Sequence, residues 1–222
     1  ARSQGEPLTG RFNMVSSEKF EHVIMATEQQ KFLMASDAGY GFVGLFADML
    51  SKNKAGKAYL SLPNAAKVLA PVRVNDIATD MCLSISNEGR MLLFPLRDLP
   101  SLGKGKGNKI INIPSAKSKT REEFVVAIAV VPLGSDVKVL AGKRGMTLKA
   151  SDLEHYYGER GRRGNKLPRG LQRVDGVEVL NGHQDDALDD GIVDPSLNPD
   201  SASDTPSNNV TTPQSDDLFG ED

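Results

Sequence analysis

The sequence has 222 residues, of which 39 % are hydrophobic, with 27 basic and 29 acidic side chains and a single cysteine, Cys82. This length suffices for one large domain or two small ones. A single cysteine excludes an intrachain disulfide. No apolar run approaches the roughly 20 residues that span a bilayer. Cys82 lies in the apolar run 81–83 and is expected to be a small buried hydrophobe.

Three units of one kind follow one another along the chain, each an apolar stretch, a glycine turn and a second apolar stretch. Residues 5–11 resemble the end of an earlier unit, so the sequence is expected to begin inside one. Because glycine supplies the positive φ of tight turns, each unit predicts a β-hairpin. The paired stretches are 32–36 with 42–46, 81–86 with 91–94, and 137–140 with 146–148. The turn glycines Gly39, Gly89 and Gly142 are 50 and 53 residues apart, which is typical of propeller blades.

An aspartate and then a glycine-rich basic loop follow each hairpin. Asp48, Asp98 and Asp152 occur once per unit, which favours a structural role in a turn or cap over carboxylate catalysis. The basic loops span 51–57, 103–109 and 158–166, and a strand-like segment follows each loop, at 58–62, 110–113 and 170–174. Further strands are predicted at 68–74, 124–131 and 177–180, and residues 149–157 are compatible with a turn or two of helix.

These elements predict an all-β, propeller-like fold with several four-stranded blades over residues 1–180, in repeats near 32–75, 81–131 and 137–180. Residues 181–222 hold 11 acidic residues and no Lys or Arg, which leaves residues 1–180 with 27 basic and 18 acidic residues. With few large apolar side chains, this acidic tail cannot offset its chain entropy and is expected to be disordered.

The recurrence of the basic loop is the strongest functional signal. Lysines and arginines on a repeated element would form a stripe, and glycines would let the backbone approach a phosphate closely. Such a stripe predicts tight binding of duplex DNA with little sequence preference. The candidate DNA-binding residues are Lys52, Lys54, Lys57, Arg90, Lys104, Lys106, Lys109, Lys143, Arg144, Arg160, Arg162, Arg163, Lys166 and Arg169. A solvated turn, or a loop that binds an acidic partner protein, is the alternative for each loop.

Catalytic and metal sites find no support in the sequence. Residues 103–107 lack the Ser/Thr and the helix that a nucleotide-binding loop requires. His22, His155 and His183 lie far apart without partners at metal-ligand spacing, and no nucleophile–base arrangement stands out. Aromatic residues make up only 5 % of the chain, which favours duplex DNA over stacked single strands.

Several segments resemble the A subunit of bacterial type IIA DNA topoisomerases, most specifically that of topoisomerase IV. The resemblance runs from about Gly5 to about Val179 and does not cover the tail. Its motifs are LMASDAGYGF at 33–42, GKGKGNKIINIP at 103–114, GERGRRG at 158–164 and RGLQR at 169–173. Gyrase A is the alternative within the same family, but its Gln-Arg-Arg-Gly-Gly-Lys-Gly box is absent, and residues 160–164 echo it only in part.

The resemblance implies a β-pinwheel, a propeller-like ring whose blades exchange strands, with duplex DNA bound and bent around a basic rim. It implies a non-catalytic C-terminal domain that presents a second DNA segment to the breakage–reunion core during supercoil relaxation and chromosome decatenation. The implied partners are the remainder of the A polypeptide and the ATPase-bearing B polypeptide, in an A2B2 assembly. No cofactor is expected in this chain, and the ATP and Mg²⁺ of the whole enzyme would be bound elsewhere. The implied location is the cytoplasm, on the chromosome, with the inner membrane surface as an alternative.

The family's cleavage tyrosine is not expected in this chain. That tyrosine directly follows an arginine, whereas Tyr40, Tyr59, Tyr156 and Tyr157 all follow other residues.

The acidic tail suggests a regulatory hypothesis, in which the tail competes with DNA for the basic loops. Deletion of residues 181–222 would then tighten DNA binding at low salt, and unchanged binding would reject the hypothesis.

Overall fold

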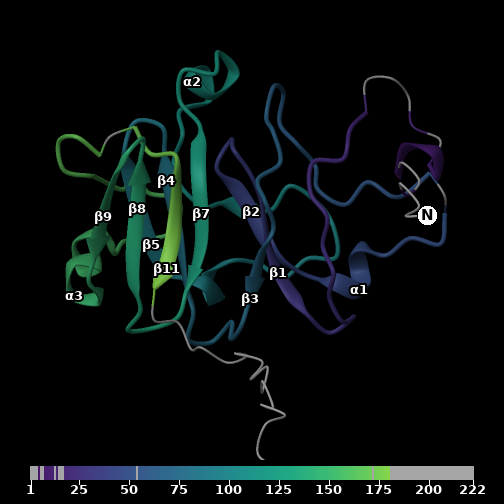
Figure 1. Cartoon of the computed structure of the whole chain (residues 1–222), viewed down its shortest axis with the longest axis horizontal. Helices are drawn as coiled ribbons and strands as arrows, with labels where there is room; N and C mark the ends of the chain where they lie inside the picture. The colour runs from purple at the N-terminus through teal and green to yellow at the C-terminus, as the bar shows by residue number, and fades with distance from the viewer. Residues whose placement is uncertain are drawn as a thin grey trace, which may run out of the picture. The chain divides into compact units, whose positions relative to one another are not determined.

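The computed structural model describes Gly5, residues 8–12, Met14 and residues 18–53, 55–171 and 173–180. Its strands form three antiparallel sheets (Figure 1). Sheet 1 has the order β3-β1-β2-β6, from β1 (Lys31–Ser36), β2 (Tyr40–Leu45), β3 (Val72–Val74) and β6 (Asn108–Lys109). Sheet 2 has the order β10-β5-β4-β7, from β4 (Met81–Ser86), β5 (Arg90–Pro95), β7 (Val125–Val131) and β10 (Asn165–Lys166). Sheet 3 has the order β11-β8-β9, from β8 (Asp136–Ala141), β9 (Arg144–Leu148) and β11 (Gly176–Leu180). The predicted acidic tail lies outside the described residues.

Each sheet is built on one hairpin at a predicted position. The pairs β1–β2, β4–β5 and β8–β9 are antiparallel neighbours. Their turns contain Gly39, Gly89 and Gly142 at φ values of +81°, +68° and +59°, a region that a side chain with a Cβ rarely adopts. The three predicted hairpins and the reason for their glycines are therefore confirmed.

The fourth strand of sheets 1 and 2 comes from the next repeat along the chain. β6 follows the second hairpin but pairs with β2 of the first, and β10 follows the third hairpin but pairs with β5 of the second. The sheets therefore cross the repeat boundaries inferred from the sequence. This exchange of strands fits the all-β pinwheel class that the resemblance implied.

Two glycines make the exchange sterically possible. Gly107 and Gly164 directly precede β6 and β10 and have φ values of +75° and +72°. A Cβ on Gly107 would collide with the backbone of Gly41, and one on Gly164 would lie 2.5 Å from the carbonyl oxygen of Met91. The Gly-Asn-Lys sequence at both places thus reflects close backbone approach.

The strand-like segments predicted after the basic loops are wrong in position. The paired strands are β6 and β10, which lie within the predicted loops, and residues 58–62 form only the single bridge Leu60↔Gly105. Residues 110–113 are outside any strand, although Ile110, Ile111 and Ile113 are buried in the core between sheets 1 and 2. Their apolar character thus reflects packing, because burial without ladder pairing gives the same sequence pattern as a short strand.

Neighbouring sheets pack face to face, so that sheet 2 is buried on both sides. Leu83 and Ile85 of β4 point into the cluster shared with sheet 3, whereas Cys82 points into the cluster shared with sheet 1. Successive side chains of a strand point to opposite faces, and a strand covered on both faces therefore has a continuous apolar sequence. Burial of Cys82 confirms its prediction and raises the pKa of its thiol.

Short helical turns lie at the places of the repeated aspartates. They are α1 (Phe46–Met49), η2 (Leu96–Asp98) and α3 (Ala150–Leu153), with η1 (Leu8–Gly10), α2 (Ser115–Lys119) and η3 (Glu154–Tyr156) elsewhere. The backbone N–H of Lys149 donates to Oδ2 of Asp152 at 3.0 Å, which confirms the predicted structural role for that aspartate. Asp48 and Asp98 lie within the equivalent turns. None of the helices in the described part of the chain is long and apolar enough to cross a membrane.

Candidate nucleic-acid interface

Two of the three basic loops lie at the edges of the sheets that face away from the inner strands. β7 contacts both β3 and β11, so these three strands form the inner side of the array. In sheets 1 and 2 the opposite edge is formed by β6 and β10. The segments 103–109 and 158–166, called here the sheet 1 loop and the sheet 2 loop, end in these outer strands. The sequence pattern thus marked two segments that occupy equivalent outer edges.

The sheet 1 loop presents its lysines to solvent. The loop begins just after Ser101, which forms a β-bridge with Val43, and it ends in β6, where Asn108 pairs with Gly41. Lys104, Lys106 and Lys109 are exposed. The Nζ of Lys106 lies 4.4 Å from the centroid of the Tyr40 ring, and the Nζ of Lys109 donates to Oδ1 of Asn112 at 2.9 Å.

The sheet 2 loop touches the end of the sheet 1 loop directly. The N–H of Gly161 donates to the carbonyl oxygen of Ile110 at 3.0 Å, and the N–H of Asn112 donates to the carbonyl oxygen of Arg162 at 2.9 Å. The guanidinium of Arg160 donates to the carbonyl oxygen of Lys109 at 2.9 Å. The two basic loops therefore meet in one continuous surface.

The other cations of the sheet 2 loop differ in whether a carboxylate pairs with them. Arg162 and Glu159 form an exposed ion pair at 2.7 Å, which contributes little to stability and can open for a phosphate. Lys166 in β10 is exposed and has no ion pair or hydrogen-bonded side-chain partner among the described residues.

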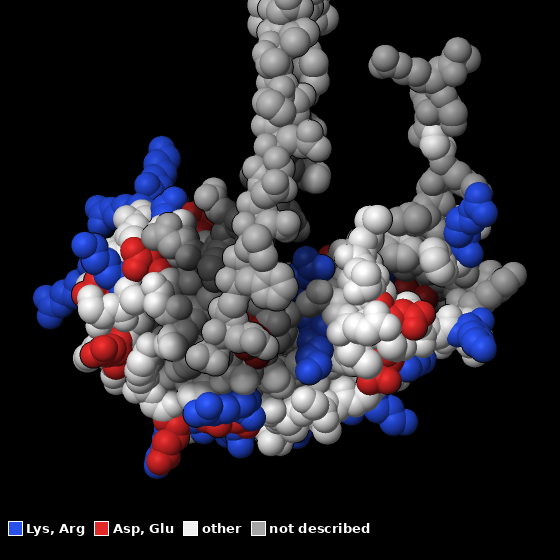
Figure 2. All heavy atoms as spheres, turned by 90° about the horizontal axis from the view of Figure 1, so that it is seen from below, with Lys and Arg blue, Asp and Glu red and all other residues white. Residues whose placement is uncertain are grey.

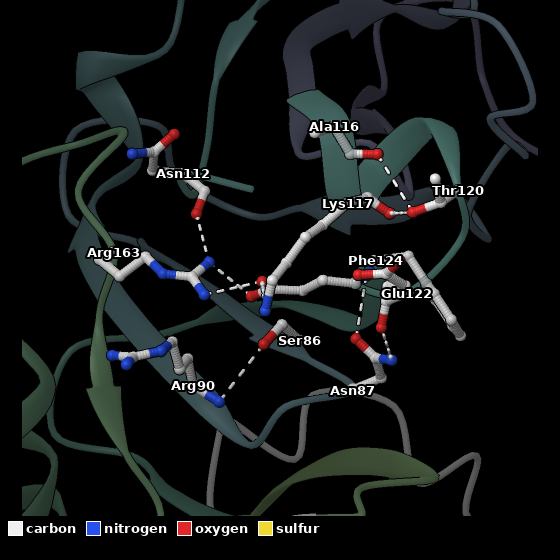
Figure 3. Close-up of polar contacts among 11 residues, drawn as sticks. Ser86, Asn87, Arg90, Asn112, Ala116, Lys117, Thr120, Glu122, Phe124 and Arg163 are labelled. Atoms are coloured by element: carbon white, nitrogen blue, oxygen red, sulfur yellow. Dashed lines mark hydrogen bonds and ion pairs between the residues drawn. The ribbon is translucent and has the colours of Figure 1, made fainter. Parts of the chain in front are cut away.

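Arg163 points toward a buried carboxylate and the carbonyl oxygen of Asn112 (Figure 3), and Arg90 contacts the same loop through a backbone carbonyl. Arg163 binds the carboxylate of Glu123 with both Nη atoms, at 2.7 Å for the Nη2–Oε2 pair, and donates to the carbonyl oxygen of Asn112. Glu123 is fully buried, with Lys117 4.0 Å away. Arg90 donates to the carbonyl oxygen of Gly164 at 3.2 Å. Both arginines hold the sheet 2 loop in place, but only Arg163 is paired with a carboxylate among the described residues.

The remaining predicted cations lie in the first basic loop and around sheet 3. Lys52 and Lys57 are exposed, and Lys54 lies outside the described residues. Near the β8–β9 turn, Lys143 and Arg144 line a shallow cavity together with Arg173. Arg169, which is near Arg173 in the sequence, is exposed. Arg173 was missed by the sequence prediction, although it lies only four residues beyond Arg169.

Charge on one face of the molecule is mixed. Figure 2 shows Lys and Arg side chains projecting mainly from the margins of the view, with Asp and Glu side chains interspersed among them. The exposed lysines of the two touching loops are therefore a local cationic feature of a face that is not uniformly basic.

Two of the four tyrosines are held in their neutral forms. Burial and the nearby Asp48 raise the pKa of Tyr59 to about 12, and burial and Asp152 raise the pKa of Tyr156. Within the described ranges no three His, Cys, Asp or Glu side chains are placed to share a metal ion. Deprotonation to a nucleophilic phenolate is therefore disfavoured at Tyr59 and Tyr156.

Comparison with known sequences points to one group of proteins. The family model "DNA gyrase C-terminal domain, beta-propeller" matches residues 80–132. The chain is 55 % identical over 179 residues to the A subunit of DNA topoisomerase 4 from Pseudomonas aeruginosa and 51 % identical to that from Escherichia coli K12. Each match covers 81 % of this chain but 24 % of the relative, so the chain spans about a quarter of the length of these curated relatives.

Comparison with solved structures finds the same group of proteins. The C-terminal domain of E. coli ParC matches with a TM-score of 0.74 and 50 % sequence identity, covering 80 % of this chain and 71 % of that domain. A DNA gyrase A C-terminal domain matches with a TM-score of 0.61 at 15 % identity, over 80 % of this chain and 59 % of that one. The second likeness supports the fold alone.

Proposed function

The chain belongs to the family of C-terminal domains found in the A subunit of topoisomerase IV, and from this premise we propose that its outer edge binds and bends duplex DNA. The observation that carries the proposal is the direct contact between the sheet 1 and sheet 2 loops, which joins the cations of two successive repeats. Phosphates spaced along a duplex would meet these cations in order, and their neutralisation would release counterions.

Two kinds of group would contact phosphate. Charge comes from side chains that face solvent at least in part and that no described carboxylate neutralises. Among the predicted candidates they are Lys52, Lys57, Arg90, Lys104, Lys106, Lys109, Lys143, Arg144, Arg160, Lys166 and Arg169. Glycines of the loops leave room for a phosphate beside the backbone. Contacts of both kinds read no base edges, so binding would be largely independent of sequence.

Bending follows from the arrangement of the sheets. Their inner strands contact one another, and the outer edges belong to different sheets, so a duplex that follows successive edges would curve around the protein. The deformation energy of the duplex is offset by the additional phosphate contacts that the curve permits.

In the whole enzyme, this surface would hold a second DNA segment for the breakage–reunion core during supercoil relaxation and decatenation. The cleavage tyrosine, ATP and Mg²⁺ would belong to other parts of an assembly of two A and two B polypeptides. This role would place the chain in the cytoplasm on the chromosome.

Fluorescence anisotropy with two unrelated duplexes over a salt series tests the proposal. We expect similar affinities for both duplexes and a steep linear fall of log K with log salt concentration. The double variant Lys104→Gln/Lys166→Gln should lower the slope by about two, whereas Lys138→Gln, which removes an exposed partner of Glu178, should leave it unchanged. Binding of an acidic protein without binding of duplex would instead favour a protein-interaction module.

A further inference from the structure

A cavity of about 120 Å³ opens beside the sheet 1 loop, where three lysines from two elements converge. Lys106 and Lys109 come from the loop, and Lys119 comes from the end of α2. Ser115 and Ser118 of α2 add hydroxyl groups to the lining, which also includes Tyr40 and Asn64. Its volume is several times what a single water molecule requires, so the cavity has room for a small polar group.

The charges around this cavity are unbalanced. All three lysines are exposed, and no acidic residue lines the cavity in the described part of the chain. Gathering like charges raises their mutual repulsion, and an anion between them removes that cost. Lysine ammonium groups and serine hydroxyls are hydrogen-bond donors, which suits the acceptor oxygens of a phosphate.

Two of the lysines are already oriented by neighbours that carry no net charge. Lys106 lies over the Tyr40 ring, and Lys109 donates to the side chain of Asn112. Lys119 forms no hydrogen bond or ion pair through its ammonium with another described residue, so this group is available to a ligand. The site is therefore partly preorganised and has one free cation at its rim.

We propose that this cavity binds a phosphate group and, resting on the proposed function, that the group belongs to the DNA backbone. α2 then extends the DNA contact beyond the glycine-rich loops, and Lys119 and Ser118 are DNA ligands that the sequence pattern did not mark. Because Lys106 and Lys109 belong to both the cavity and the sheet 1 loop, the bound phosphate adjoins the proposed path of the duplex.

The test compares Lys119→Gln with Lys31→Gln in the whole chain. Lys31 is an exposed lysine at the far end of the β1–β2 hairpin, paired with Leu45, whereas Tyr40 lies at the turn end. We expect Lys119→Gln to lower the salt slope of duplex binding by about one and Lys31→Gln to leave it unchanged. Ser118→Ala should weaken binding without altering the slope. Equal slopes for the two lysine variants, with duplex still bound by the wild type, would overturn the site and leave the proposed function standing.

A titration with inorganic phosphate separates the two claims. In the wild type, the amide resonances of Ser115 and Ser118 should shift and saturate, and Lys119→Gln should abolish the saturation. Saturation without any duplex binding would retain the phosphate site and reject DNA as its source. An absence of shifts with both inorganic phosphate and duplex would reject the site itself.

Discussion

At Arg163 the guanidinium lies against a fully buried carboxylate, that of Glu123, and joins the sheet 2 loop to the segment before β7. Nothing in the local sequence distinguishes Arg163 from Arg162, its exposed neighbour, because both stand in one run of glycines and arginines. Only the partner, 40 positions away in the chain, separates an arginine that supports the loop from one that faces solvent. The sequence could therefore predict the basic loops but not which of their cations are free.

Replacement Glu123→Gln should lower the free energy of unfolding by about 2–3 kcal/mol, because it leaves the guanidinium of Arg163 without its buried counter-charge. Glu159→Gln removes the exposed partner of Arg162 and should cost less than about 0.5 kcal/mol. Urea unfolding of both variants measures the difference. Equal effects would show that the buried ion pair contributes no more to the free energy of unfolding than the exposed one.

Tyr59 should make stability sensitive to alkaline pH. Its folded pKa is raised from 10.0 to about 12, so above pH 10 the unfolded state loses the phenolic proton while the folded state keeps it. The contribution of Tyr59 is therefore complete below pH 10 and is lost as the pH rises toward about 12. Tyr59→Phe should flatten this part of the stability curve, and Tyr157→Phe, at a half-exposed site, should not. A curve that the first change leaves unaltered would contradict the assignment.

The outer strands show where local sequence reasoning ends. Hairpins were predictable because a turn glycine and two flanking apolar stretches are adjacent in sequence. β6 and β10 were not, because each pairs with a hairpin from another repeat, and neither strand carries an alternating apolar pattern of its own. The repeated Gly-Asn-Lys triplet was the available signal, and steric need explains its glycine.

Gly107→Ala should destabilise the attachment of β6 to sheet 1. The new Cβ would meet the backbone of Gly41 while φ stays positive, a combination that should cost more than about 1 kcal/mol. Gly103→Ala in the same loop is the matched control, because a Cβ there lies at ordinary contact distance, 3.6 Å from Asp48. Hydrogen exchange of the β2 amides, with unfolding by urea, reports both effects. The assignment fails if the two alanines are equally tolerated.

For the whole molecule, repeat spacing and loop composition were sufficient to predict an all-β propeller-like array with cations at a recurring position. The order of the strands and the contact between the loops depend on how neighbouring repeats pack. They could not be predicted from composition, because the buried isoleucines at 110–113 resemble a strand in the sequence and fill the core in the structure. That packing would set the path of the bound DNA.

Energy transfer between dyes at the two ends of a short duplex tests the proposed curved path most directly. At saturating protein, we expect the dye-labelled ends to approach each other. With the sheet 2 loop variant Arg160→Gln/Lys166→Gln, we expect the ends to stay farther apart even where the duplex remains bound through the other loops. An end-to-end distance that saturating wild-type protein leaves unchanged would contradict a curved path across successive loops.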